Sequence, residues 1–187
     1  MTYAAKGSIL LSVMSHAPRT GTISAIKAGP PQTPWHWVRL VGNLVNLTTP
    51  LGMLVALLGG ARIRRGPRGL LLGEGYRIPF PDASAFTIGS VITTSRSWSE
   101  LLRHNPQLFD HEERHTWQYL WCLGLPFYPA YAACLVWSVL RTGDLAARNF
   151  FERNAGLASG GYPDKPVRPI GENVQTMIGQ LRVRRTA

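Results

Sequence analysis

Residues 111–115 read His-Glu-Glu-Arg-His, and their types and spacing could support metal chemistry. On a helix, positions four apart lie on one face, so His111 and His115 would direct both imidazoles to one point. Two imidazoles at this spacing can bind a zinc ion, and Glu112 would project beside it. Glu112 could then take a proton from the water that such an ion activates. The pattern predicts a metal site with Glu112 as its general base.

A zinc site of this kind needs a third protein donor from elsewhere in the chain. Glu152 is the best candidate because it falls on a predicted helix just after the second apolar segment. The alternative to a metal ligand is that Glu152 is a surface glutamate paired with Arg148. Likewise, the alternative for residues 111–115 is a solvated helix face without a metal ion. The other candidate donors are Asp144, Glu172, His104 and Asp110.

These residues resemble the zincin metallopeptidases whose third zinc ligand is a glutamate. A longer pattern is similar to a set of small bacterial membrane proteins that carry His-Glu-x-x-His-Thr-x-Gln. It consists of residues 111–118, an apolar hairpin, residues 149–155 and Gly160-Gly161, and the resemblance covers roughly residues 70–162.

The resemblance implies that His111, His115 and Glu152 bind one Zn²⁺ per chain. It also implies that Glu112 is the general base and that the substrate is a peptide or protein. Zincins hold an extended peptide along a sheet edge beside the metal-binding helix, so residues 85–94 would form the substrate-side strand. Arg114 departs from the pattern, which usually has glycine there, and a cation leaning toward the site would compete with the metal ion.

Two apolar segments predict a membrane-associated protein. Residues 40–58 carry no charge and are about as long as a transmembrane helix must be, and the alternative is a buried or interfacial helix. Four arginines within residues 62–68 follow them, which favours that end as cytoplasmic and places the metal site at the cytoplasmic face of the cell membrane. Asn43 and Asn46 would turn a polar stripe toward protein.

The second apolar segment, residues 119–140, contains Pro126 and Pro129, which break an ordinary helix. It predicts two half-length helices, 117–125 and 130–140, that form a re-entrant hairpin. Glu152 follows this segment and His115 precedes it, so a shared metal ion requires the chain to return to its starting side.

The remaining elements complete an α+β membrane protein with one transmembrane helix. The following ranges list the expected elements: strands of a small antiparallel sheet at 70–72, 76–80 and 86–93, and helices at 97–102, 107–121 and 142–157. The predicted organisation is a flexible leader over 1–34, a membrane-associated zincin-like domain over 35–162 and a basic flexible tail over 163–187.

The formal net charge of +10 fits either an acidic polymer or a membrane partner. The arginines cluster beside the apolar segments and no nucleic-acid-binding motif is present, so we expect a lipid bilayer and no nucleic acid. Cys122 and Cys134 lie in the second apolar segment and read as packing residues. A di-iron site would need a second Glu-x-x-His, which the chain lacks, and desaturases need more histidine boxes. The remaining alternative is a non-catalytic membrane protein with a structural metal or a partner-binding role.

Overall fold

The computed structural model describes residues 27–81, 83–176 and 179, so most of the predicted leader lies outside the described residues. Its fold is α+β, as predicted, and residues 170–176 add a short helical segment to the elements named here. In chain order these are α1 (Pro34–Val45), α2 (Thr48–Leu58), β1 (Arg62–Arg65), the 3-10 turn η1 (Pro67–Gly69), β2 (Leu71–Glu74), β3 (Phe86–Ile88), β4 (Val91–Thr94), α3 (Trp98–His104), α4 (Leu108–Trp121), α5 (Phe127–Thr142) and α6 (Phe150–Ala155).

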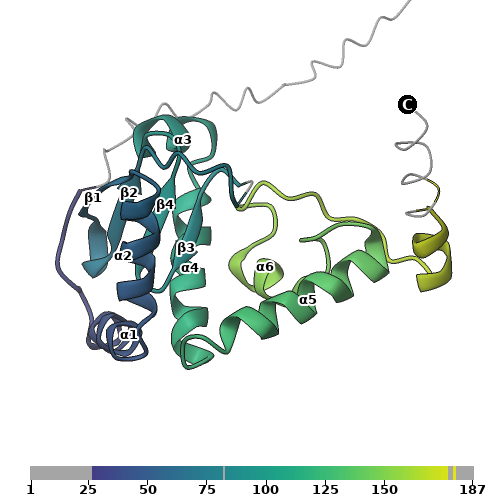
Figure 1. Cartoon of the computed structure of the whole chain (residues 1–187), viewed down its shortest axis with the longest axis horizontal. Helices are drawn as coiled ribbons and strands as arrows, with labels where there is room; N and C mark the ends of the chain where they lie inside the picture. The colour runs from purple at the N-terminus through teal and green to yellow at the C-terminus, as the bar shows by residue number, and fades with distance from the viewer. Residues whose placement is uncertain (1–26, 82, 177–178, 180–187) are drawn as a thin grey trace, which may run out of the picture.

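The sheet has four strands in the order β1-β2-β4-β3 (Figure 1). β2 pairs antiparallel with β1 but parallel with β4, and β3 pairs antiparallel with β4. The prediction of an antiparallel sheet is therefore wrong in part. After β2 the chain crosses to the far edge, forms β3 there and turns back as β4 in the centre. The expected strand at 76–80 is absent, and β1, with the sequence Arg-Ile-Arg-Arg, is a strand that the sequence does not predict.

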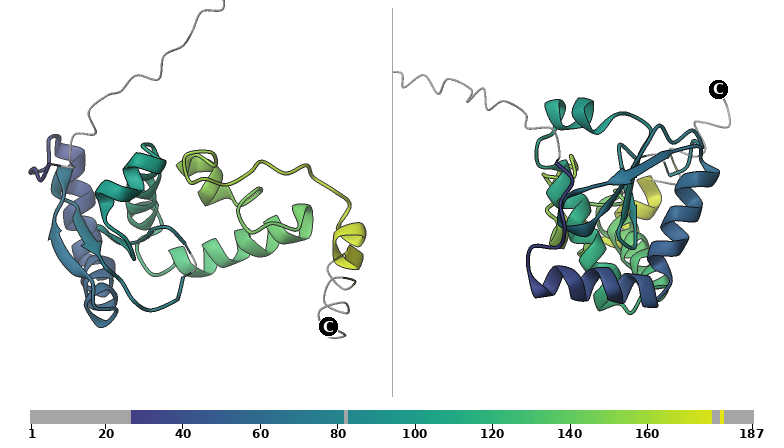
Figure 2. Two further views of the ribbon diagram at one scale, coloured as in Figure 1. Left: turned by 90° about the horizontal axis from the view of Figure 1, so that it is seen from above. Right: turned by 90° about the vertical axis from the view of Figure 1, so that its left-hand side faces the viewer.

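Two helices cover the two faces of this sheet, α2 on one side and α4 on the other (Figures 1 and 2). Side chains alternate between the faces because successive strand residues point in opposite directions. Leu71 and Val91 pack toward Ala56 of α2, whereas Leu72 and Ile92 belong to the core beneath α3 and α4. Packing against the sheet thus fixes the position of α4, the helix that carries residues 111–115.

The first apolar segment is not one helix, so the prediction of a continuous helix over 40–58 is wrong. α1 and α2 meet at a bend of 71°. Asn46 causes the break, because its side chain accepts hydrogen bonds from the amide and the hydroxyl of Thr48 (3.1 and 2.7 Å) and so starts a new helix. Among the described residues no single helix is long and apolar enough to cross a membrane, whereas α1 and α2 taken together pass by length and composition.

The second apolar segment contains two helices, as predicted, but its break lies earlier than expected. α4 ends at Trp121 and α5 starts at Phe127, with Leu123 and Gly124 at positive φ between them. Pro129 lies in the first turn of α5, where the missing amide hydrogen costs nothing.

The last predicted helix, over 142–157, is also wrong in extent. Thr142 ends α5, and Gly143 in the left-handed conformation stops it. Only α6 remains helical, and it returns to pack against both α4 and α5 (Figure 2).

Candidate metal centre

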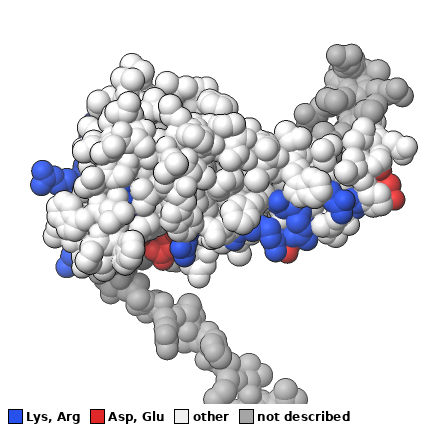
Figure 3. All heavy atoms as spheres, turned by 90° about the horizontal axis from the view of Figure 1, so that it is seen from below, with Lys and Arg blue, Asp and Glu red and all other residues white. Residues whose placement is uncertain are grey.

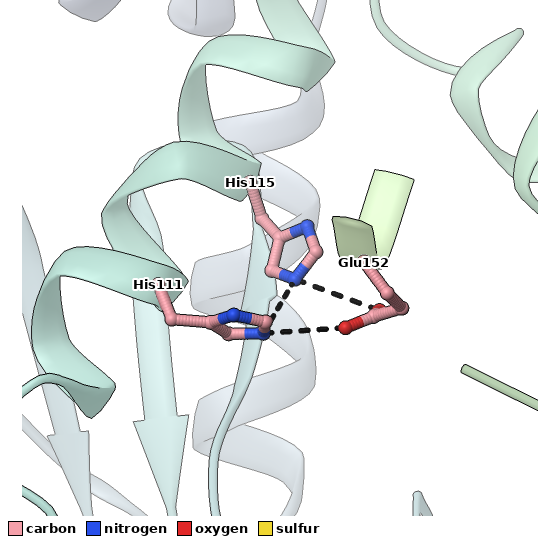
Figure 4. Close-up of side chains that lie close together, drawn as sticks. All are labelled: His111, His115 and Glu152. Carbon is pink, nitrogen blue, oxygen red and sulfur yellow. Dashed lines mark hydrogen bonds and ion pairs between the residues drawn. The ribbon is translucent and has the colours of Figure 1, made fainter. Parts of the chain in front are cut away.

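Three side chains from two helices meet at one point beside the sheet (Figure 4). His111 and His115 come from successive turns of α4, and Glu152 comes from the first turn of α6. α6 begins where the Asn149 side chain accepts the amide of Phe151 (2.9 Å), which fixes the first turn and hence Glu152. The structure thus brings together the three residues that the sequence predicted as ligands.

The donor atoms are close to one another and shielded from water. The two histidine Nε2 atoms lie 3.1 Å apart. Glu152 places Oε2 at 3.3 Å from His111 Nε2 and Oε1 at 3.6 Å from His115 Nε2. The side chains of His111, His115 and Glu152 are 2%, 10% and 3% exposed.

The other ring nitrogen of each histidine is already committed to an acceptor. His111 Nδ1 donates to the Gly156 carbonyl (3.0 Å) and His115 Nδ1 donates to Gln118 Oε1 (2.7 Å). These bonds select the tautomer with hydrogen on Nδ1, which leaves a lone pair on each Nε2. Two lone pairs therefore face each other and a carboxylate, an arrangement that calls for a cation between them.

The spacing fits a metal ion of the size of zinc. Donors at roughly 2.0–2.2 Å from a tetrahedral zinc ion lie about 3.3–3.5 Å apart, close to the separations seen here. Glu152 Oε2 is buried and has no hydrogen-bond partner among the described residues, an unusual condition for a carboxylate oxygen. The triad could hold a metal ion without rearrangement.

The charges of the site also favour a cation. Burial acts to raise the pKa of Glu152, but His111, which donates to the carboxylate when its Nε2 is protonated, the charge of His115 and the Tyr131 hydroxyl together lower it. Burial likewise acts to lower the pKa of His111, yet the Glu152 carboxylate and the charge of Glu112 raise it overall. The carboxylate therefore stays ionised, and in the absence of a metal a proton takes the cation's place.

Two further residues, Tyr131 and Gly160, shape the site. Tyr131 of α5 donates its hydroxyl to Glu152 Oε1 (2.5 Å) and so orients the carboxylate. Gly160 lies against His111, since a Cβ there would be 2.5 Å from His111 Cε1 and 2.8 Å from Nε2. Gly160 was part of the resemblance pattern, but nothing in the sequence singled out Tyr131.

Glu112 lies on the same helix and faces the sheet. Its Oε2 accepts a hydrogen bond from the hydroxyl of Thr87 in β3 (2.7 Å), and only 4% of the residue is exposed. Thr87 Oγ1 also lies 3.2 Å from the Glu112 carbonyl oxygen, to which it can donate. Thr87 was not foreseen, because the pairing joins positions that are distant in the sequence.

The remaining candidate metal donors are either paired with cations or exposed to solvent. Asp144 pairs with Lys165 (2.8 Å), and Asp110 lies 3.5 Å from Arg68. His104 and Glu172 are exposed. None of these four joins the three residues of the triad.

Arg114 is exposed, whereas its neighbours Glu113 and His115 are buried. Its cation therefore faces solvent and does not compete with a metal ion. The neighbouring Glu113 instead forms a buried ion pair with α1. Its Oε1 accepts a hydrogen bond from Arg39 Nη1 of α1 (2.7 Å), and its Oε2 pairs with Arg68.

In comparisons with protein-family models, curated proteins and solved structures, no match to this chain is found. The assignment of the site therefore rests on its own geometry: a buried His-His-Glu group, with one histidine per helical turn and a distant glutamate, that is consistent with a zincin-like metal centre.

Proposed function

We propose that His111, His115 and Glu152 bind one zinc ion per chain and that the protein hydrolyses peptide bonds. The observation that carries the proposal is the convergence of two histidine Nε2 lone pairs on a buried, unpartnered carboxylate oxygen. Zinc suits this donor set and, when bound, supplies a Lewis acid that lowers the pKa of its water to roughly 7.

Glu112 is the proposed general base. It lies next to His111 on α4, and its charge acts on that histidine. The hydrogen bond from Thr87 fixes one carboxylate oxygen and holds the side chain between helix and sheet. A base held in this way can accept a proton without first losing side-chain freedom.

β3 supports the choice of an extended peptide as substrate. It is the edge strand of the sheet, packs against α4 and carries Thr87. An edge strand offers unpaired backbone groups to which a further extended chain can add. A peptide bound along β3 would run beside Glu112, in the region predicted as the substrate-side strand.

The burial of the triad supports a second candidate, a structural metal in a non-catalytic protein. At most 10% of any of the three side chains is exposed, and the ion would tie α4 to α6. Structural zinc sites contribute folding free energy directly. Both candidate functions include a bound metal ion, and only the peptidase would hydrolyse a substrate.

We also propose that the protein associates with the cell membrane, with the metal site on the cytoplasmic side. The support is the apolar pair α1–α2 and the arginines at Arg62–Arg65 directly after it.

Metal analysis of the full-length protein tests the proposal. Wild type should contain about one zinc per chain, and His115→Ala should lose it. Glu112→Gln should keep the metal, and it should abolish cleavage of fluorescently labelled casein. Arg114→Gln, one residue away on the exposed side of α4, is the matched control and should change neither quantity.

A wild-type protein that stays folded and binds no zinc, cobalt or manganese would contradict the metal site itself. Zinc at one per chain with no cleavage, together with unfolding on chelation, would assign the ion to the structural role.

A further inference from the structure

Two exposed leucines occupy backbone conformations that leucine normally avoids. Leu47, between α1 and α2, has φ 65°, and Leu123, between α4 and α5, has φ 55°. Glycine or asparagine fits this left-handed region with less strain. Yet the two leucines are 65% and 79% exposed, so burial within the chain does not offset the strain. Strained residues of this kind are commonly retained for a function.

The two leucines lie at neighbouring turns. A Cβ on Gly124 would be 2.8 Å from Asn46 Cγ and 3.1 Å from the Asn46 carbonyl oxygen, so the α1–α2 turn touches the α4–α5 turn. Exposed apolar residues surround this contact and form what we call the apolar corner: Leu44, Val45, Leu47, Trp121, Leu123 and Leu125. No charged residue occurs within 40–61 or 116–140, the segments that supply it.

α5 extends the apolar corner along one side. Its exposed residues recur at helical spacing and are apolar or aromatic: Tyr128, Pro129, Ala132, Ala133, Val136 and Trp137. Its opposite side packs on α6 through Phe127 and Tyr131. Trp137 is 53% exposed and carries the guanidinium of Arg141 over its ring at 5.4 Å. A tryptophan beside an arginine is typical of the boundary between lipid tails and headgroups.

The face that contains these elements is shown in Figure 3, which views the molecule from the side of α1 and the α4–α5 turn. Uncharged residues cover most of it, and Lys and Arg side chains lie mainly along its edges, where some Asp and Glu side chains lie beside them. Cations around an apolar face complement a surface of anionic lipid, and the chain as a whole carries a formal charge of +10.

We propose that the apolar corner and the outer side of α5 bind the surface of a bilayer that contains anionic lipid. Leu47 and Leu123 insert among the acyl chains, while Trp137 and Arg141 lie at the headgroups. The inference rests on the membrane association proposed above, and it uses no part of the metal site. It also locates that site, because His115 lies about 1.7 turns of α4 before Trp121, about 9 Å along the helix. A substrate at the membrane surface would therefore be within reach.

Vesicle flotation of the full-length protein tests the proposal. The vesicles contain either phosphatidylcholine alone or equimolar phosphatidylcholine and phosphatidylglycerol. The test variant is Leu47→Asn/Leu123→Asn, in which both replacements suit the left-handed backbone, so stability should be kept or raised. The control is Ile78→Asn, which replaces an equally apolar residue that is 46% exposed. Ile78 lies away from the apolar corner: the amide of the preceding Arg77 donates to the Gly59 carbonyl, at the opposite end of α2 from Leu47.

Wild type and Ile78→Asn should float with the anionic vesicles and more weakly with phosphatidylcholine alone. The double variant should lose about tenfold in partitioning for each leucine, with an unchanged melting temperature and zinc content. Equal flotation of the double variant and wild type would overturn the proposal. The proposal would also be overturned if wild type and Ile78→Asn were dimers in vesicle-free buffer and the double variant were a monomer. The apolar corner would then bind a second copy of the chain. Vesicle binding by protein that carries no zinc would uphold this inference while contradicting the proposed function.

Discussion

Gln118 connects His115 to the helix that carries Glu152. Its Oε1 accepts the hydrogen on His115 Nδ1 (2.7 Å), and its Nε2 donates to the Phe151 carbonyl (2.9 Å) and to Asn154 Oδ1 (3.1 Å). One buried amide thus orients a ligand on α4 and holds α6 in position. This explains why a glutamine three residues after the second histidine belongs to the site.

Replacing Gln118 with methionine keeps the volume and removes all three hydrogen bonds. His115 loses its orientation and α6 loses its link to α4, so zinc affinity should fall by about 10- to 100-fold. Competition with a chromophoric chelator measures this. Gln107→Met is the control, because Gln107 is exposed and its side chain has a hydrogen bond to Ser159 alone (3.2 Å) within the described part of the chain. Unchanged zinc affinity in Gln118→Met would show that the bond to His115 does not tune the site.

The backbone of Gly160 lies against the ring of His111, with no room for a side chain between them. In Gly160→Ala the new methyl group would press on the imidazole and on Tyr162, whose Cε2 would be 2.7 Å away. The ring must then turn away from His115, and zinc affinity should fall roughly tenfold or more. Gly171→Ala is the control, since nothing lies within 4 Å of its added Cβ. The same titration of zinc against a chelator compares the two variants. Equal zinc affinities would mean that residues 156–162 shift to make room for the methyl group and that His111 keeps its position.

Much of the metal centre could be predicted from the sequence because it depends on local geometry. The spacing of His111 and His115 needs only a helix, and the predicted bounds of that helix agree with α4. Glu152 was chosen because it falls on a predicted helix just after the second apolar segment, and it lies in α6. Tyr131 and Thr87 could not be predicted, because their contacts depend on how α5 and β3 pack against the site.

The errors in the fold have a similar origin. Asn46 was read as one residue of a polar stripe, but its side chain starts a second helix, which depends on a local hydrogen bond and not on hydrophobicity. The strand β1 was not expected at Arg62–Arg65, because a charged segment becomes a strand here only through pairing with β2. The parallel pairing of β2 with β4 depends on a crossover over the residues between them, and no local pattern encodes it.

Arg39 is a buried cation that joins α1 to α4. It is fully buried, donates to Glu113 and to the Arg68 carbonyl (2.6 Å), and lies 5.1 Å from the centre of the Trp117 ring. Arg39→Met should lower the free energy of unfolding by about 3–5 kcal/mol, because removing one partner leaves a buried charge poorly compensated. Urea denaturation measures the loss.

A surface pair provides the comparison for Arg39. Arg64 lies 3.3 Å from Glu74, with 40% and 30% of the two side chains exposed. Arg64→Met should cost less than about 1 kcal/mol, since water already screens the pair. Similar losses in the two variants would mean that Arg68 alone can compensate Glu113.

Acid should release the metal through His111. The pKa of His111 is raised above its usual 6.5, because the Glu152 and Glu112 carboxylates outweigh the opposing effect of burial. The pKa of Glu152 is below its usual 4.5, so the carboxylate is ionised across the range in which His111 takes up a proton. A protonated imidazole cannot bind zinc. Zinc affinity should therefore start to fall above pH 6.5 as the solution is acidified, as a chelator titration at each pH would show.

Without metal, the same two groups should make the folded state most stable in mild acid. The raised pKa of His111 contributes stability that is complete below about pH 6.5 and is lost as the pH rises through the folded-state value. The lowered pKa of Glu152 contributes stability above about pH 4.5 that is lost on further acidification. Thermal unfolding in chelator should show wild type stabilised relative to Glu152→Gln most strongly between these values. A stability difference that grows from about pH 6 to about pH 8 would contradict the ion pair between His111 and Glu152.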